Sequence, residues 1–198
     1  WSAADPTIDL LEALGPGRIL SHFRIERAIG KGGFAYVFEA TDLQLHRTVA
    51  LKALRARNRE QAATLLGEAR LAASLNHPNV CTIHSVDDSD GLPVIVMEYV
   101  NGSTLADLSK AGLPPAFDVL ETDRQIAEAL AAAHDAGIVH GDLKPANVMI
   151  AEGDRVKILD FGLARRTIDD TDALARLDGS PGAAGSDPLV SDATVDAP

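Results

Sequence analysis

Three polar residues that could do chemistry lie close together in the segment IVHGDLKPANVMI, residues 138–150. Asp142 carries a carboxylate, Lys144 an ammonium group and Asn147 a carboxamide, and apolar runs flank them on both sides. Burying a polar group without a hydrogen bond costs about 2–7 kcal/mol, so these side chains need partners. We expect those partners to lie outside the protein chain.

A lysine and a glutamate interrupt two apolar patterns earlier in the chain. In the expected strand TVALKAL, a period of two places Ala50, Lys52 and Leu54 on one face. Glu68 lies on the apolar stripe of an expected helix. These positions predict an ion pair between Lys52 and Glu68. The alternative is that Lys52 extends to solvent and Glu68 lies at the edge of its stripe.

A glycine-rich turn and an acidic turn complete the set. In IGKGGFAYVFEA, the glycines Gly30, Gly32 and Gly33 separate two expected strands, so backbone N–H groups there can approach a phosphate. A strand follows the turn, which excludes a dinucleotide fingerprint, and no Gly-Lys-Ser/Thr closes a Walker loop. Asp160 follows the strand VKIL and can hold a cation. Taken singly, these features are also typical of an ordinary hairpin and a strand-to-loop turn.

The elements that must position these residues follow from hydrophobic periodicity. We expect strands at FRIERAI, AYVFEA, TVALKAL and VIVMEYV, and a helix over residues 58–75 with Asn58 and Gln61 placed as a capping box. Residues 105–136 are expected to be helical and to stop at Gly137. The short strands IVH, VMI and RVKILD follow, the last two joined by a turn over residues 152–154. From Thr167 onward the composition predicts disorder.

Composition narrows the class of protein. The chain has 198 residues, a formal net charge of −11 and 46% hydrophobic residues, which suit a folded domain without a nucleic-acid partner. The single cysteine, Cys81, excludes an intramolecular disulfide. No apolar run is long enough to span a membrane, and the first residues lack the pattern of a signal peptide. We therefore expect a cytoplasmic protein without a membrane segment.

Taken in order, these motifs resemble the signature set of the protein-kinase family. The set comprises the glycine turn, Val-Ala-Leu-Lys, the helical Glu68, His-Gly-Asp-Leu-Lys-Pro-Ala-Asn and Asp-Phe-Gly. The segments LNHPNV and VMEYVNGSTL are similar to the family's helix-to-strand link and to its hinge between lobes. The resemblance covers residues 23–166, and ATDLQLHRTVALKAL resembles the bacterial Ser/Thr members.

The resemblance implies an α+β, protein-kinase-like fold, with an N-terminal antiparallel β-sheet lobe containing one helix and an incomplete, mainly helical C-lobe. Residues 1–22 would be an extension or linker and 23–97 the N-lobe. Residues 98–166 would hold the hinge and a partial C-lobe with the catalytic loop. Residues 167–198 would be a disordered tail similar to an activation segment.

The resemblance also implies a role for each site residue. Asp142 would accept the proton of a substrate hydroxyl or orient that hydroxyl, and Lys144 would steady the transferring phosphoryl group. Lys52, paired with Glu68, would bind the α- and β-phosphates of ATP. Two Mg²⁺ ions would be held by Asn147 and Asp160, and the catalytic loop would be braced by His140. The remaining ATP contacts would be Ile29, Gly30, Lys31, Gly32 and Gly33 at the phosphates, Val37, Ala50 and Met149 on adenine, Met97 as gatekeeper, and the backbones of Glu98 and Val100.

Three departures from the family pattern keep alternatives open. Ala35 replaces the third glycine of the turn. Gly141 stands where many protein kinases have an arginine that reads a phosphate on the activation loop, and His-Gly-Asp is also similar to aminoglycoside phosphotransferases. No Ala-Pro-Glu follows Asp160. The expected function is ATP-dependent phosphorylation of Ser/Thr in a protein substrate; the alternatives are a catalytically impaired nucleotide-binding or interaction module and a small-molecule phosphotransferase.

Overall fold

The computed structural model describes residues 14–32, 35–55, 59–87, 92–114, 117–161 and 165–166. All of them belong to the first of two compact units, Trp1–Thr167. The predictions made for residues 1–13, for Gly33, for the Asn58 cap and for a disordered tail from Thr167 lie outside the described residues. None of the helices in the described part of the chain combines the length and apolar character that crossing a bilayer requires.

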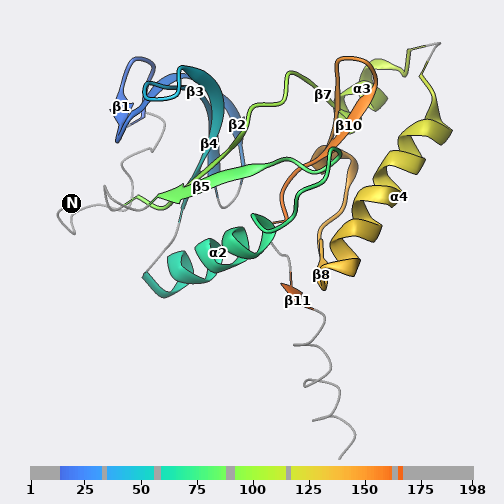
Figure 1. Cartoon of the computed structure of the whole chain (residues 1–198). Coiled ribbons are helices and arrows are strands. Elements are labelled where there is room, and N and C mark those ends of the chain that lie inside the picture. The colour runs from blue at the N-terminus through green and yellow to red at the C-terminus, as the bar shows by residue number, and fades with distance from the viewer. Residues whose placement is uncertain are drawn as a thin grey trace, which may run out of the picture. The chain divides into compact units, whose positions relative to one another are not determined.

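A six-stranded antiparallel sheet forms the N-terminal part of the fold (Figure 1). Its spatial order is β1-β2-β3-β4-β6-β5, so only the last pair departs from the order along the chain. The predicted strands FRIERAI, AYVFEA and TVALKAL each fall within one of these strands, whereas VIVMEYV extends two residues beyond the end of β6. The six strands are β1 (Ile19–Leu20), β2 (Phe23–Lys31), β3 (Ala35–Asp42), β4 (Arg47–Leu54), β5 (Ile83–Asp87) and β6 (Val94–Glu98).

Alternation along β3 and β4 gives the sheet two different faces. Phe38 on β3 lies opposite Leu51 on β4, which in turn lies opposite Val96 on β6. All three side chains are at most 1% exposed and belong to one apolar cluster. Directly opposed residues of antiparallel strands share a face, so this row marks one side of the sheet. The neighbouring residues on each strand point to the other side.

Helix α2 (Arg59–Ala72) covers part of that other side, and Figure 1 shows it running beside β5. Its buried residues Leu66 and Ala69 form a cluster with Leu54 of β4 and Ile95 of β6. Of the stripe predicted for this helix, Ala72 is buried, but Leu65 and Glu68 are only half-buried, because the buried face is centred on Leu66 and Ala69. Helix α2 also ends before Leu75. Residues 73–75 continue in turns, with the amide of Leu75 donating to the Ala72 carbonyl at 3.1 Å.

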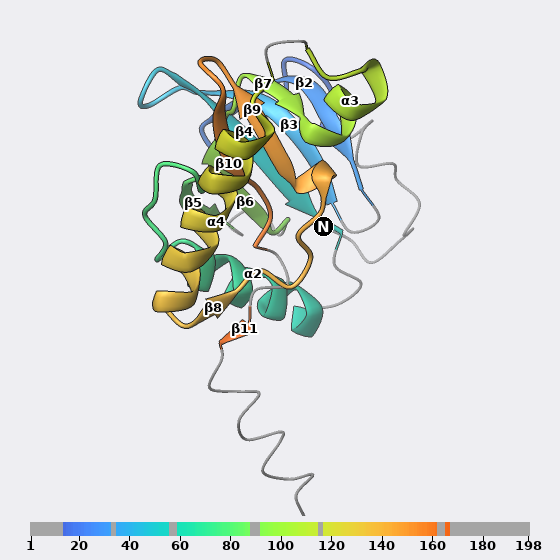
Figure 2. The ribbon, with the colours of Figure 1, turned by 90° about the vertical axis from the view of Figure 1, so that its right-hand side faces the viewer.

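A second, three-stranded sheet and two helices follow (Figure 2). The strands β7 (Gly102–Thr104), β9 (Val148–Ala151) and β10 (Arg155–Ile158) pair in the order β10-β9-β7. The helices are α3 (Leu105–Ala111) and α4 (Val119–Asp135), and α4 packs against β10. A second antiparallel pair joins β8 (Ile138–Val139) to β11 (Arg165–Arg166), and the 3₁₀ turn η1 is Pro145–Asn147.

The expectation of one helical segment over 105–136 was wrong, because the chain breaks between α3 and α4. Gly112 has a φ of +86°, a left-handed conformation that ends α3. Pro114 follows two residues later, and the residue before a proline is disfavoured in the α conformation. Asp118 then caps α4, its Oδ1 accepting from the Glu121 amide at 2.9 Å. The predicted helix stop is confirmed: Gly137 follows α4 with a φ of +72°.

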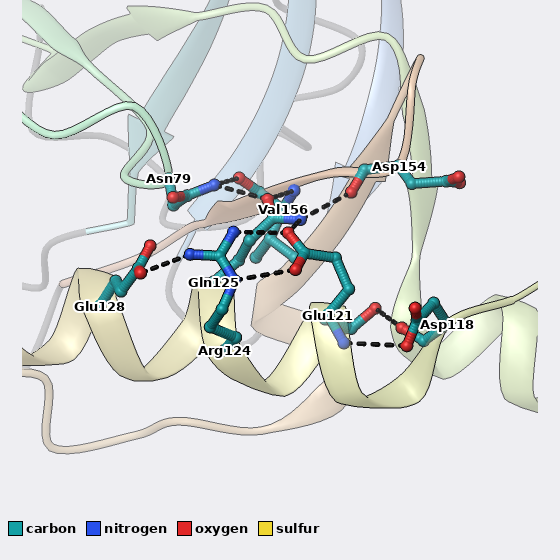
Figure 3. Close-up of polar contacts among 9 residues, drawn as sticks. Asn79, Asp118, Glu121, Arg124, Gln125, Glu128, Asp154 and Val156 are labelled. Carbon is teal, nitrogen blue, oxygen red and sulfur yellow. Dashed lines mark hydrogen bonds and ion pairs between the residues drawn. The ribbon is translucent and has the colours of Figure 1, made fainter.

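A buried polar network fixes β10 against α4 (Figure 3). Gln125 of α4, 8% exposed, accepts hydrogen bonds at Oε1 from the Val156 amide at 2.9 Å and from Asn79 Nδ2 at 2.8 Å. Asn79 Nδ2 also donates to the Val156 carbonyl at 2.9 Å. Gln125 Nε2 donates to the Asp154 carbonyl at 3.0 Å. The strand that leads to Asp160 is thus held by side chains from two other segments.

Candidate active site

The sheet brings several of the predicted ligand contacts onto its α2-facing side. Gly30 on β2 lies opposite Val37 on β3, and Val37 lies opposite Lys52 on β4. Two residues before Lys52 on β4, Ala50 lies opposite Met97 of β6. Because opposed residues and residues two apart share a face, Val37, Ala50, Lys52 and Met97 point to the same side. A Cβ at Gly30 would lie 3.4 Å from Val37 Cβ, which is an ordinary van der Waals contact.

The ammonium of Lys52 forms an ion pair with the carboxylate of Asp160. This contact joins two motifs that are 108 residues apart in the sequence. The Lys52 side chain is 15% exposed and that of Asp160 is 41% exposed, so the pair lies at the edge of the protein interior. Asp160 has a φ of +58°, a left-handed conformation that an aspartate tolerates better than most residues. The partner of Lys52 in this structure is therefore a residue of the Asp-Phe-Gly turn.

Glu68, the partner predicted for Lys52, lies half-buried on α2, on the helix that packs over this face of the sheet. The pair between Lys52 and Glu68 stays a prediction.

The three polar residues of the opening motif contact one another. Lys144 Nζ donates to Asp142 Oδ2 at 2.6 Å. Asn147 Nδ2 donates to the Asp142 carbonyl at 2.8 Å and lies 3.3 Å from Asp142 Oδ2. The hydrogen bond from the Lys144 ammonium, with help from Asn147, holds the pKa of the Asp142 carboxyl below its usual value. The three residues therefore form one polar unit in which Asp142 is ionised.

His140 connects this loop to the strand that carries Asp160. The ring is 2% exposed; its Nδ1 accepts from the Asp142 amide at 3.2 Å, so Nε2 carries the proton and donates to the Leu159 carbonyl at 2.9 Å. The Leu159 amide donates to the Asn147 carbonyl at 2.8 Å. The His140 ring also lies 4.6 Å from that of Phe161, which is buried. The bracing role expected for His140 thus has a direct structural basis.

The remaining predicted contacts come from other elements. Glu98 ends β6, Val100 follows it in the segment leading to β7, and Met149 lies half-buried on β9. Ile29, Lys31 and Gly32 lie at the exposed end of β2, where the Gly32 amide donates to the Ala35 carbonyl at 2.9 Å.

The local structure accounts for Ala35 and Gly141, the two residues that depart from the family motif. Ala35 is 6% exposed and packs in the cluster below α2, so its methyl group contributes to the core. Gly141 has a φ of +76°, a conformation that glycine adopts at little cost and that most other residues avoid. The glycine therefore matches the backbone of the loop on which Asp142 is placed.

Sequence reasoning missed the polar residues that link these segments. Lys157 alternates with the buried residues Val156 and Ile158 on β10, and its ammonium lies 2.8 Å from Glu98 Oε2. Asn79 and Gln125 form the buried network described above. Two signals in the sequence could have identified two of these residues. Lys157 interrupts a short apolar strand, and Gln125 lies on the same helix face as the buried Ala129 and Ala133.

Comparison with known proteins gives a consistent picture. The model of the protein kinase domain family matches residues 23–182. A relative from Streptomyces coelicolor, named "Probable serine/threonine-protein kinase SCO3848", is 43% identical over 160 residues, covering 76% of this chain and 24% of the relative. The serine/threonine-protein kinase PrkC of Bacillus subtilis is 41% identical over 154 residues, covering 74% of this chain and 23% of PrkC. The chain thus spans about a quarter of the length of these curated relatives.

A solved structure supports the same fold. The kinase domain of Mycobacterium tuberculosis PknI matches with a TM-score of 0.64 and 30% sequence identity, over 77% of this chain and 64% of that one. The predicted fold, an antiparallel sheet lobe with one helix followed by a partial helical lobe, is confirmed.

Proposed function

This chain belongs to the protein kinase domain family, and on that premise we propose that it transfers the γ-phosphoryl group of Mg-ATP to Ser or Thr hydroxyls of a protein substrate. The observation that carries the proposal is the ion pair between Lys52 and Asp160. A cation for phosphate and a carboxylate for metal come together there from two motifs 108 residues apart. Phosphoryl transfer depends on such charge neutralisation and positioning more than on covalent help from the protein.

The donor set suits magnesium. Asn147 and Asp160 would hold the ion through hard oxygen atoms, which Mg²⁺ prefers, together with phosphate oxygens and water. Asn147 Nδ2 donates to the Asp142 carbonyl at 2.8 Å, so Oδ1 is the atom of this amide suited to a metal. The bound ion would neutralise charge on the β- and γ-phosphates.

The other residues would act on the two reacting ends. Asp142 would orient the substrate hydroxyl and receive its proton as the oxygen bonds to the γ-phosphorus and the bond to the bridging β–γ oxygen breaks, releasing ADP. Its low pKa keeps it in the accepting, ionised form. Lys144 lies 2.6 Å from Asp142 and would balance charge on the transferring group. Lys52 would move from Asp160 to the α- and β-phosphates.

The direct test is phosphoryl transfer from labelled Mg-ATP to generic Ser/Thr proteins. We expect Asp142→Asn to lower the rate at least about 100-fold, the scale of general base catalysis, without weakening Mg-ATP binding in a thermal-shift titration. Asp135→Asn is the matched control, because this aspartate is exposed at the end of α4, and it should behave as wild type. Equal loss in both variants, or transfer that survives Asp142→Asn, would contradict the proposed role.

Two other outcomes separate the alternative functions. Gly141, the feature shared with small-molecule kinases, makes aminoglycosides the informative second class of acceptor in the same assay. Transfer to them and not to proteins would replace the proposed substrate class. Binding of Mg-ATP without transfer to either acceptor would identify a nucleotide-binding module.

A further inference from the structure

A partly buried ion pair connects β6 to β10. Lys157 Nζ lies 2.8 Å from Glu98 Oε2, and the two side chains are 14% and 30% exposed. The residues are 59 positions apart in the sequence. Glu98 Oε2 also accepts from the Thr82 amide at 3.2 Å, and Lys157 Nζ donates to the Val80 carbonyl at 3.5 Å. Each charged group therefore bonds its partner and the backbone of the segment over residues 79–82.

The backbone of Glu98 is held by the same segment. Its amide donates to the Thr82 carbonyl at 2.8 Å, and its carbonyl accepts from Cys81 Sγ at 3.6 Å. On the other side of the segment, the Cys81 amide donates to the Ile158 carbonyl at 2.9 Å. Residues 79–82 thus lie between the end of β6 and the end of β10 and are bonded to both.

The charge state of the pair is well defined. Burial alone would raise the pKa of the Glu98 carboxyl, but the hydrogen bonds from the Lys157 ammonium and the Thr82 amide outweigh it and leave this pKa below its usual value. Glu98 is therefore ionised near neutral pH. Partial burial also reduces screening by salt, so removing either partner leaves a charge that solvent compensates poorly.

We infer that Lys157 is a positioning residue, which through Glu98 keeps the backbone that would face adenine in register with the metal ligand Asp160. This inference rests on the proposed function, because that function assigns the Glu98 carbonyl to adenine and Asp160 to Mg²⁺. Lys157 is a residue of β10, and Asp160 follows two residues after the end of this strand, so a shift of β10 moves both. The site would then have two half-sites, the Glu98 backbone at adenine and Asp160 at Mg²⁺. A ligand that contacts both half-sites depends on their relative position, whereas a ligand that contacts only one does not.

The test compares Mg-ADP, which spans both half-sites, with adenosine, which occupies one. Isothermal titration calorimetry with the 198-residue chain gives the Kd of Mg-ADP, and competition gives that of adenosine. We expect Lys157→Met and Glu98→Gln each to weaken Mg-ADP about tenfold, within the roughly 2- to 30-fold range of couplings of this kind. Adenosine should change less than about twofold. The double variant removes the same interaction and leaves no unpaired charge, so it should weaken Mg-ADP no more than the more affected single variant does.

Two controls keep the result specific. Lys157→Arg retains the charge and should restore affinity to within about twofold of wild type. Arg124→Gln removes exposed ion pairs on α4 and should leave both affinities unchanged. If Lys157→Met does not fold, Glu98→Gln carries the test, since it keeps the size and shape of the side chain.

The possible outcomes are distinguishable. Wild-type chain that binds no Mg-ADP overturns the proposed function and this inference together. Wild-type binding with unchanged affinity in Lys157→Met and Glu98→Gln overturns the inference alone. Equal weakening of adenosine and Mg-ADP also overturns it, because the pair would then shape only the adenine side.

Discussion

The buried network around Gln125 allows a stability prediction that follows directly from its contacts (Figure 3). Replacing Gln125 by methionine keeps an unbranched side chain of similar length and helix propensity but removes the amide. The Val156 amide, in a residue that is 0% exposed, then loses its acceptor, and Asn79 Nδ2 loses one of its two. The exposed Asp154 carbonyl can bond water instead.

The expected magnitude follows from which groups remain unsatisfied. A buried donor without an acceptor costs about 1–3 kcal/mol, and the second bond, whose donor keeps another acceptor, about 0.5–1 kcal/mol. We therefore expect Gln125→Met to lower the free energy of unfolding by about 1.5–4 kcal/mol. A loss of this size is a large fraction of the about 5–15 kcal/mol that stabilises a typical domain.

Urea unfolding followed by far-UV circular dichroism measures the change. The matched control is Arg124→Gln, one residue away on the exposed face of α4, where Arg124 pairs with Glu121 and Glu128. Surface pairs of this kind contribute about 0–1 kcal/mol, so the control should stay close to wild type. If Gln125→Met shifts the midpoint no more than Arg124→Gln does, the network contributes nothing specific and the reasoning is wrong.

Three further predictions concern the N-terminal sheet and its neighbours. Phe38→Ala should cost about 3–5 kcal/mol in urea unfolding, because the side chain is 1% exposed in the core, whereas Leu45→Ala at an exposed turn should cost little. Burial raises the pKa of the Cys81 thiol to about 12, so iodoacetamide should label native protein at pH 8 far more slowly than urea-unfolded protein; equal rates would disprove the burial. Burial alone would raise the pKa of Asp42, but bonds from the Leu45 and Gln44 amides and the charges of His22 and Arg47 leave it lowered. The stabilisation that the Asp42 carboxylate provides is therefore complete above the unfolded pKa of about 3.9 and is lost as pH falls through the lower folded pKa. Asp42→Asn should thus lower the free energy of unfolding by about 1–2 kcal/mol at pH 7 and by less at pH 3. A deficit that grows on acidification would contradict this sign.

Local sequence patterns determined the elements and the order of the motifs. The alternation in TVALKAL placed Ala50, Lys52 and Leu54 on one face, and β4 confirms it, because Leu51 packs in the apolar cluster on the opposite side of the sheet from Leu54. The sequence also predicted the cluster of Asp142, Lys144 and Asn147, because its members lie within five positions of one another along the chain. These features depend on neighbours along the chain, which period and turn chemistry describe well.

Tertiary structure alone decided which distant charges meet. Lys52 pairs with Asp160, 108 residues away along the chain. Lys157 pairs with Glu98, and Gln125 bonds Asn79, across separations of 59 and 46 residues. A pattern of period two or 3.6 fixes the face on which a side chain lies, but the identity of its partner depends on how strands and helices pack across that face. For this protein the sequence therefore determined which residues could act, and the fold determined which of them act on one another.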